Sequence, residues 1–494
     1  MSPEVKSAQE SAKQTTTTAA PRLLDQILAG TTLARKQEQT HDLVRELAEQ
    51  VSAGHVTIGR DVEATINALI AQTDKMISQQ LDEIMHHPEF QKLEASWRGL
   101  KYLLDNSETS DMLKIRVLNV SKRELLRDLE KAAEFDQSEL FKRVYNDGLG
   151  VYGGLPIGAL IGDFEFTNHP EDMELLKRVA EVAAASHAPF LSAVGPGMFG
   201  LEAYSEIESI RDISKKMDTP EYATWRSFRQ SEDSRYVGLC MPHVLMRLPF
   251  GKNTRRVEAF DYEEGVDGAD HSKYLWGNAA YALATRLTAS FADYHWCSTI
   301  RGPAGGGRVD GLPVHNFRTP SGDIAMKCPA EVQVPDRREK ELADQGFIPF
   351  VHCVGENYGA FFSVQSAQSP KKYDKDSATA SARLSAQLPY IFSVSRFAHY
   401  LKAMMRDNIG SYASRADTQT KLQKWISGYV TADDDASPKV KAEFPLREAE
   451  IQVLDVPGQP GVYRAVMHLR PHFQLDEIKV SLRLVAELPQ IKQG

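Results

Sequence analysis

The chain has 494 residues, of which 42% are apolar and 25% are charged, and its formal net charge is −9. This length exceeds what one hydrophobic core organises, so the sequence predicts two or three domains. The acidic balance argues against nucleic acid as a partner, because binding to phosphates requires a basic surface. No apolar run reaches the roughly 20 residues of a membrane span, so we expect no direct insertion into a membrane.

The N-terminal sequence and the spacing of the cysteines indicate in which cellular compartment the protein works. Residues 1–20 contain no apolar core, which predicts a disordered tail and not a secretory signal. The four cysteines, at positions 240, 297, 328 and 353, are widely spaced and form no CxxC pair. This spacing predicts neither a disulfide framework nor a metal site, and it favours a cytoplasmic location.

Residues 21–58 are predicted to form an N-terminal helical segment. Pro21 suits the first turn of a helix, and a narrow apolar stripe follows it. The stripe consists of Leu23, Leu24, Ile27 and Leu28. A short amphipathic helix behind a flexible tail suits docking in a partner's groove, and it suits packing on its own domain equally well.

Residues 59–110 are predicted to form a helical region. From Asp61 an apolar face recurs with helical period over about seven turns, and the His86-His87-Pro88 sequence ends it. The next helix carries Phe90, Leu93, Trp97, Leu100 and Leu104. These stripes indicate helix–helix packing, either within the chain or between subunits.

From residue 111 strands alternate with helices, which is typical of an α/β layer. The range 111–250 is predicted to be an α/β domain, 251–376 a second α/β domain or an insertion in the first, and 377–445 a set of helices that return to the core. The expected strands lie at 113–120, 156–164, 189–195, 236–250, 347–354 and 360–365, and the expected helices begin at Pro170 or span 273–294 and 336–344.

The C-terminal range 446–494 holds three strand-like runs, separated by the Pro-Gly cluster at 457–461 and by Pro471-His472. In the middle run Val462, Arg464 and Val466 share one face. In the last run Ile478, Val480, Leu482 and Leu484 share one face. Such a ribbon is barely stable alone. It is either an ordinary terminal sheet covered by its own domain or a sheet completed by strands of another chain.

The Gly-rich loop at 301–311 is the best candidate for an enzyme site. Its backbone N–H groups, with Arg301 and Arg308, suggest a phosphate- or nucleotide-binding enzyme as an alternative function. The loop lacks the order of a P-loop, so a tight structural turn is favoured. The three consecutive aspartates at 433–435 lack the spacing of a calcium loop. We therefore expect no catalytic residues, cofactor or metal.

Six blocks of the sequence resemble one known family. The chain is similar to the large sheath subunit of type VI secretion systems, the TssC/VipB family of contractile sheath proteins. The blocks are PRLLDQILAG (21–30), EFQKLEASWRGLKYLL (89–104), IGDFEF (161–166), LWGNAAYAL (275–283), SVSRFAHYLKAMMRDNIG (393–410) and LRPHFQLDEIKVSLRLVAELP (469–489).

The resemblance implies a structural protein and not an enzyme. The implied fold is α/β (mixed α+β) and multi-domain, a contractile-sheath fold with an N-terminal helical region and C-terminal strands shared between subunits. Family members assemble with a small sheath subunit (TssB/VipA-like) and further copies of themselves into a cytoplasmic helical sheath. The sheath surrounds an inner-tube protein (Hcp-like), stands on baseplate components, and is disassembled after contraction by an AAA+ unfoldase (ClpV-like).

The resemblance also assigns roles to residues. The strand residues Val462, Arg464, Val466, Ile478, Val480, Leu482 and Leu484 become candidates for an intersubunit sheet. The stripe at Leu23, Leu24, Ile27 and Leu28 becomes a candidate for binding the unfoldase. Five cations on the helices of 396–428 become candidates for contact with the inner tube, the alternative being a solvated helix face: Arg396, Lys402, Arg406, Lys421 and Lys424.

Overall fold

The structure is a computed structural model, and it describes residues 45, 62–268, 270–319, 321–411, 414–433, 435–458, 462–472 and 474. The tail predicted over 1–20 lies outside these residues, and so does the segment 21–58 except for Arg45. The stripe at Leu23, Leu24, Ile27 and Leu28 and the last strand run at Ile478, Val480, Leu482 and Leu484 also lie outside. The chain divides into two compact units, Met1–Ser78 and Gln79–Gly494.

The two helices predicted between residues 62 and 105 are confirmed. Helix α3 spans Val62–Met85, so the described part of the first unit is the beginning of this helix. Helix α4 spans Pro88–Asp105. Pro88 stands in the first turn of α4, where a backbone N–H would have no helical partner in any case.

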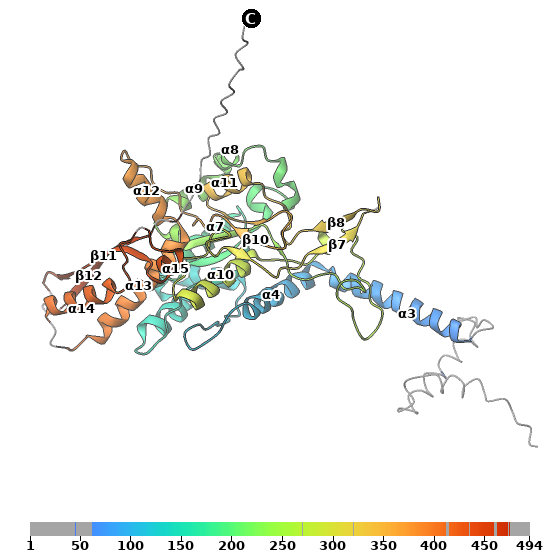
Figure 1. Cartoon of the computed structure of the whole chain (residues 1–494), viewed down its shortest axis with the longest axis horizontal. Coiled ribbons are helices and arrows are strands. Elements are labelled where there is room, and N and C mark those ends of the chain that lie inside the picture. Colours follow the sequence, from blue (N-terminus) through green and yellow to red (C-terminus); the bar gives the residue numbers. More distant parts are fainter. Residues whose placement is uncertain are drawn as a thin grey trace, which may run out of the picture. The chain divides into compact units, whose positions relative to one another are not determined.

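A six-stranded sheet forms the centre of the second unit (Figure 1). In spatial order it runs β1 (Leu160–Phe166), β2 (Phe190–Val194), β3 (Val237–Met241), β9 (Ile348–His352), β10 (Gly359–Phe361) and β6 (Arg308–Val309). The first four strands are parallel, and β10 and β6 are antiparallel to their neighbours. Every residue of β2, β3 and β9 is buried, which explains their continuous apolar sequences.

Helices cover both faces of this sheet. Helix α10 (Ala279–Tyr294) packs along one face and against α4. Helices α7 (Pro170–Ser186) and α9 (Ala223–Gln230) belong to the core on the other face. Successive residues of β2 supply the two cores, because Phe190 packs with α7 and Leu191 packs with α10.

Strands from both sides of the predicted boundary at 250/251 form this one sheet. β1, β2 and β3 come from the range 111–250, whereas β9, β10 and β6 come from 251–376. The later range therefore extends the sheet of the earlier one. Sequence periodicity does not reveal this arrangement, because parallel strands joined by crossovers pair irrespective of their separation along the chain.

The strand predicted at 113–120 is wrong. These residues form no regular element, and they pair with none of the strands in the described ranges. Ile115 packs against a small core that contains Leu103 and Tyr281. Val117 and Leu118 are exposed, so only part of this apolar run packs on the domain, and that packing requires no partner strand.

Shorter elements complete the sheet domain. Ser121 and Glu124 form a capping box at the start of α5. The short helices and strands are α5 (Lys122–Lys131), α6 (Glu139–Phe141), α8 (Ile213–Met217), α11 (Asp336–Asp344), β4 (Val244–Leu245), β5 (Trp276–Gly277), β7 (His315–Arg318) and β8 (Ile324–Lys327). The π-helix η2 spans Lys142–Gly150, and the 3₁₀ turns are Phe135–Gln137, Pro196–Phe199, Tyr204–Ser209, Pro220–Tyr222, Asp233–Tyr236 and His271–Lys273.

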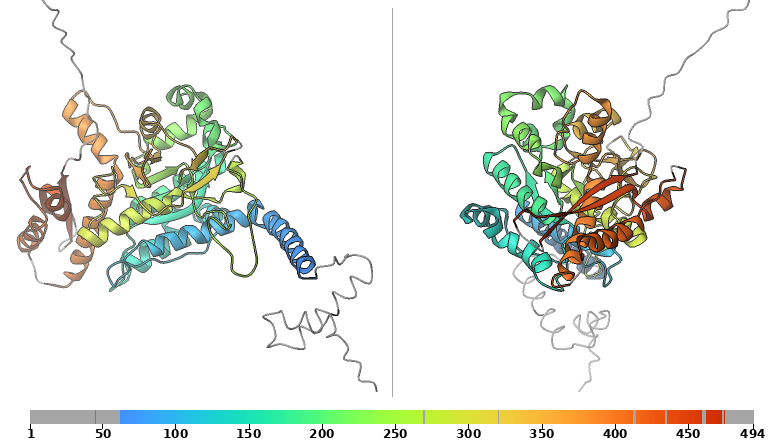
Figure 2. Two further views of the ribbon diagram at one scale, coloured as in Figure 1. Left: turned by 45° about the vertical axis from the view of Figure 1, so that its right-hand side comes forward. Right: turned by 90° about the vertical axis from the view of Figure 1, so that its left-hand side faces the viewer.

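The C-terminal part forms a separate core around a β-hairpin (Figure 2). Its elements are α12 (Asp376–Ser385), α13 (Leu388–Asp407), α14 (Arg415–Ser427), α15 (Pro438–Glu443), β11 (Leu446–Asp455) and β12 (Tyr463–Pro471). Trp296 stacks on Phe397 of α13 with ring centroids 4.3 Å apart, and Leu422, Ile451 and Val453 close the core. The mixed α/β class predicted from the sequence is confirmed.

Candidate functional site

The hairpin of β11 and β12 is the first candidate surface. The two strands are antiparallel, with Ile451 opposite Met467 and Val453 opposite Ala465. Met467 and Ala465 pack toward the core, whereas Arg464 on the other face is exposed. The predicted alternation of β12 is therefore confirmed, and Val462, Arg464 and Val466 lie on the face away from the core.

The middle strand run ends at Pro471, as predicted, and residues 473 and 475–494, on which the predicted turn depends, lie outside the described residues. The backbone N–H of His472 donates to the carbonyl of Pro445 at 3.2 Å, so the chain still runs alongside the residue that precedes β11. Farther on, the N–H of Gln474 donates to the Tyr390 hydroxyl at 3.0 Å, and its Nε2 donates to the carbonyl of Ser298 at 2.7 Å. Proline signals a turn in sequence, but it also fits the last residue of an edge strand.

The five predicted tube-facing cations fall into two groups. Three of them are half-buried against their own chain. The Arg396 guanidinium lies 4.7 Å from the Tyr400 ring centroid, and the Lys402 ammonium lies 5.0 Å from that of Tyr145. Burial lowers the pKa of Lys402. Arg406 donates to the carbonyl of Val151 at 2.7 Å.

The other two cations, Lys421 and Lys424, lie on α14 and are exposed. Lys421 Nζ donates to Asn408 Oδ1 at 3.1 Å, which leaves its charge at the surface. These two lysines are therefore the members of the predicted set that can meet a partner without rearrangement of the chain.

In the Gly-rich loop, three backbone N–H groups donate hydrogen bonds to carbonyl groups of the protein itself. The N–H of Gly302 donates to the carbonyl of Phe361 at 2.7 Å, and the N–H groups of Gly305 and Gly307 donate to the carbonyl of Gly302. Gly306 has a positive φ of 90°, and a Cβ there would lie 2.2 Å from the carbonyl oxygen of Thr299. This geometry favours the structural turn over a phosphate cradle.

An ion triad at the carboxyl ends of β1 and β3 has no signal in the sequence. It joins half-buried His243 and Glu331 to the exposed Glu165. His243 Nδ1 lies 2.6 Å from Glu331, and its Nε2 lies 2.9 Å from Glu165. Burial lowers the pKa of His243, but the hydrogen bonds and charges of the two glutamates outweigh burial and raise it to about 10. Both ring nitrogens are occupied, so this imidazolium acts as a structural cation.

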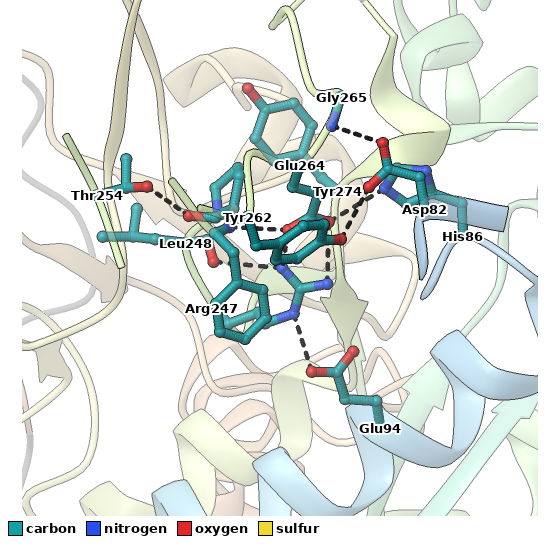
Figure 3. Close-up of polar contacts among 12 residues, drawn as sticks. Asp82, His86, Glu94, Arg247, Leu248, Thr254, Tyr262, Glu264, Gly265 and Tyr274 are labelled. Carbon is teal, nitrogen blue, oxygen red and sulfur yellow. Dashed lines mark hydrogen bonds and ion pairs between the residues drawn. The ribbon is translucent and has the colours of Figure 1, made fainter. Parts of the chain in front are cut away.

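A second buried network fixes the junction of α3 and α4 to the sheet domain (Figure 3). Arg247 pairs with Glu264 at 2.7 Å and with Glu94 of α4 at 2.9 Å. Glu264 also lies 3.1 Å from His86, the residue after α3. Asp82, in the last turn of α3, accepts a hydrogen bond from the Tyr262 hydroxyl at 2.8 Å. The polar segment 251–270 is therefore partly buried, and its side chains hold the junction of the two helices on the domain.

The apolar stripe predicted on α4 has two environments. Leu103 is buried against α10. Phe90, Leu93, Trp97 and Leu104 lie within one narrow sector of the helix and are exposed, with 67% of Trp97 accessible. The helix therefore packs on the domain by one side and presents an aromatic and aliphatic stripe on the other.

Comparisons with known proteins match both parts of the chain to protein families. Residues 67–368 match the family described as "EvpB/VC_A0108, tail sheath N-terminal domain", and residues 377–488 match "EvpB/VC_A0108, tail sheath gpW/gp25-like domain". The chain belongs to the VipB family of tail sheath proteins. Within this VipB protein, the sheet domain lies in the first match, and the hairpin and α12–α15 lie in the second.

One curated relative extends over nearly the whole chain. The "Type VI secretion system sheath protein TssC1" of Pseudomonas aeruginosa is 48% identical over 463 residues, which cover 93% of each chain. The VipB chain is thus a structural subunit of a type VI secretion contractile sheath, as the resemblance predicted. Within the described residues, no helix is long and apolar enough to cross a membrane.

Two solved assemblies are similar at lower levels. The anti-feeding prophage baseplate gives a TM-score of 0.35 at 10% identity over 64% of this chain and 66% of that chain, just under two thirds of its length. The contracted helical sheath of the same prophage gives a TM-score of 0.28 at 11% identity, over 64% and 67% of the two chains.

The His243 triad predicts a pH dependence of stability in this VipB protein. Because the pKa of His243 is raised by folding, its contribution is complete below about pH 6.5, declines above that value and is lost as the pH passes about 10. His243→Gln should remove this decline. It should also lower the free energy of unfolding at pH 6.5 by about 1–3 kcal/mol, since the half-buried Glu331 loses its charged hydrogen-bond partner, whereas the exposed Glu165 can be solvated by water.

Denaturant unfolding across this pH range measures both effects. His468→Gln is the matched control, because His468 is exposed on β12. An unchanged pH profile in His243→Gln would contradict the assignment of the triad.

Proposed function

We propose that this chain assembles in the cytoplasm with a small sheath subunit and further copies of itself into a helical sheath. The sheath surrounds an inner tube, stands on a baseplate, and contracts to propel the tube and its effectors out of the cell. The relative named as a type VI sheath protein supports this function over almost the whole length of the chain. The single structural observation that supports it is the open edge of β12.

The open edge suits the addition of a strand from another copy. β12 pairs with β11 on one side and with no strand on the other within the described ranges. The run with Ile478, Val480, Leu482 and Leu484 has strand periodicity and follows β12 along the sequence. We assign this run to β12 of a neighbouring subunit. Main-chain hydrogen bonds of an added strand can persist while subunit bodies rotate during contraction.

A proline at the open edge tests this assignment. Ala465→Pro removes one N–H that points away from β11, so the inward ladder survives while an added strand loses a partner. We expect the variant to co-purify with the small subunit, and the long tubes that the wild-type pair forms in negative-stain electron micrographs to be absent.

Ala465→Val is the matched control, because it adds similar bulk, keeps the N–H and favours a strand. It should form tubes of normal length. Tubes of normal length from Ala465→Pro as well would refute strand addition at this edge.

The inner tube is the second proposed partner. Lys421 and Lys424 are exposed, so an acidic tube surface can meet them through weak contacts that release on contraction. To contact the tube, the other three cations would have to break contacts with their own chain: Arg396, Lys402 and Arg406. Helix α14 is therefore the better candidate for the tube contact.

Charge reversal of α14 tests the tube contact. Because an exposed ion pair contributes at most about 1 kcal/mol, Lys421→Glu with Lys424→Glu should lower the tube protein retained in isolated sheaths severalfold at low salt and less at high salt. Lys439→Glu, on exposed α15, is the control. Equal retention by the reversed and control sheaths, measured by quantitative gel densitometry, would exclude α14.

The unfoldase is the third proposed partner, and the stripe at Leu23, Leu24, Ile27 and Leu28 is its proposed site. Leu24→Asp with Leu28→Asp should leave assembly and contraction intact and abolish disassembly by the unfoldase with ATP, because a buried carboxylate is costly in an apolar groove. Light scattering follows disassembly. Gln26→Asp, which lies off the apolar stripe of the helix predicted from the sequence, is the control. An undiminished rate in the double variant would rule out this stripe.

A further inference from the structure

The outer edge of β11 is occupied by side chains of α14. Gln423 Nε2 donates to the carbonyl of Ala449 at 3.1 Å, and Gln423 Oε1 accepts from the N–H of Ile451 at 2.9 Å. One side-chain amide thus supplies the donor and the acceptor that a neighbouring strand would supply.

The same pattern continues along β11. Gln419 Oε1 accepts from the N–H of Val453 at 3.3 Å, and Arg415 Nη1 donates to the carbonyl of Val453 at 3.3 Å. At the other end, Leu446 exchanges hydrogen bonds with Tyr429 and Thr431. The outward-facing backbone of β11 is therefore engaged at 446, 449, 451 and 453.

The edge of β12 has the opposite character. In an antiparallel pair, residues that do not bond each other point their N–H and C=O groups to the two outer edges. Because Ile451 and Val453 bond α14, their partners Met467 and Ala465 must face the outer edge of β12. Among the described residues, no group bonds the backbone N–H of Met467 or Ala465.

We propose that Gln419 and Gln423 are specificity-determining residues that close one edge of the hairpin, so that a strand from another copy adds only to β12. This inference rests on the proposed function, since it specifies which edge receives the C-terminal run. A strand that arrived at β11 would have to displace both glutamines and would leave their amides without those partners. Closure of one edge is a form of protection against unwanted strand pairing.

Disulfide trapping in the assembled sheath locates the added strand. Neighbouring strands lie about 4.8 Å apart, so a disulfide forms to the adjacent strand and not to the next one. Arg464→Cys reports on β12 and Glu450→Cys reports on β11, since both side chains are exposed. Each is combined in turn with Lys479→Cys, Ser481→Cys and Arg483→Cys. The pair that forms a disulfide most efficiently then gives the register of the added strand.

In sheaths with native glutamines, we expect disulfide-linked dimers from the Arg464→Cys set and only background from the Glu450→Cys set. Gln419→Leu with Gln423→Leu should raise the Glu450→Cys yield to that of the Arg464→Cys set. The control is Thr420→Leu, because the Thr420 hydroxyl is exposed and bonds only its own helix at Ala416. Equal yields at both edges with native glutamines would overturn the inference.

Hydrogen exchange on the unassembled full-length chain separates this inference from the proposed function. The amides of Ile451 and Val453 should exchange slowly and those of Ala465 and Met467 fast, and the double leucine variant should make all four fast. Fast exchange at Ile451 and Val453 in the native chain would overturn edge closure even if strand addition is correct. Slow exchange there, with no dimers from either cysteine set, would uphold edge closure and refute strand addition.

Discussion

The hydrogen-bonding requirement of backbone groups at strand edges governs the C-terminal part of this sheath subunit. Each N–H and C=O at an edge needs a partner or water, and an edge with neither pairing nor cover invites another strand. The two edges of the hairpin differ, because α14 occupies the edge of β11 whereas none of the described residues covers the outer edge of β12. The side-chain amides of α14 make this asymmetry a property of the folded subunit before any partner arrives.

The sheet domain depends on a second constraint, which is the cost of burying charge. Arg247, Glu264 and Glu94 are largely removed from solvent, and their mutual attraction must offset the loss of hydration. Removal of any one partner would leave a buried charge without compensation. The network therefore holds the junction of α3 and α4 in one position on the domain. The apolar packing of the inner face of α4 alone would fix that position less precisely.

Helices were predictable where the sequence pattern that specifies them lies within the helix itself. The periods and caps of α4, α5, α7 and α11 lie within each helix, so the sequence predicts them well. The strand predicted at 113–120 failed because a strand requires a partner strand elsewhere in the chain. The His243 triad joins residues 78 and 88 positions apart, and Arg247 reaches Glu94 across 153 positions, distances over which periodicity carries no information. Likewise, charge alone did not separate Lys402, half-buried over an aromatic ring, from the exposed Lys424.

In the proposed pairing, each subunit has one edge that accepts a strand, at β12, and one C-terminal run that is given to a neighbour. In the proposed pairing, a copy gives its C-terminal run to one neighbour and receives a run from another, so the contact joins two different surfaces. Contacts of this head-to-tail kind generate open helical assemblies when the rotation between copies does not close a ring. A second open edge would allow two acceptors for each donor and would break the one-to-one match. The closure of β11 by Gln419 and Gln423 is thus the feature that makes a continuous, unbranched sheath follow from the geometry of a single hairpin.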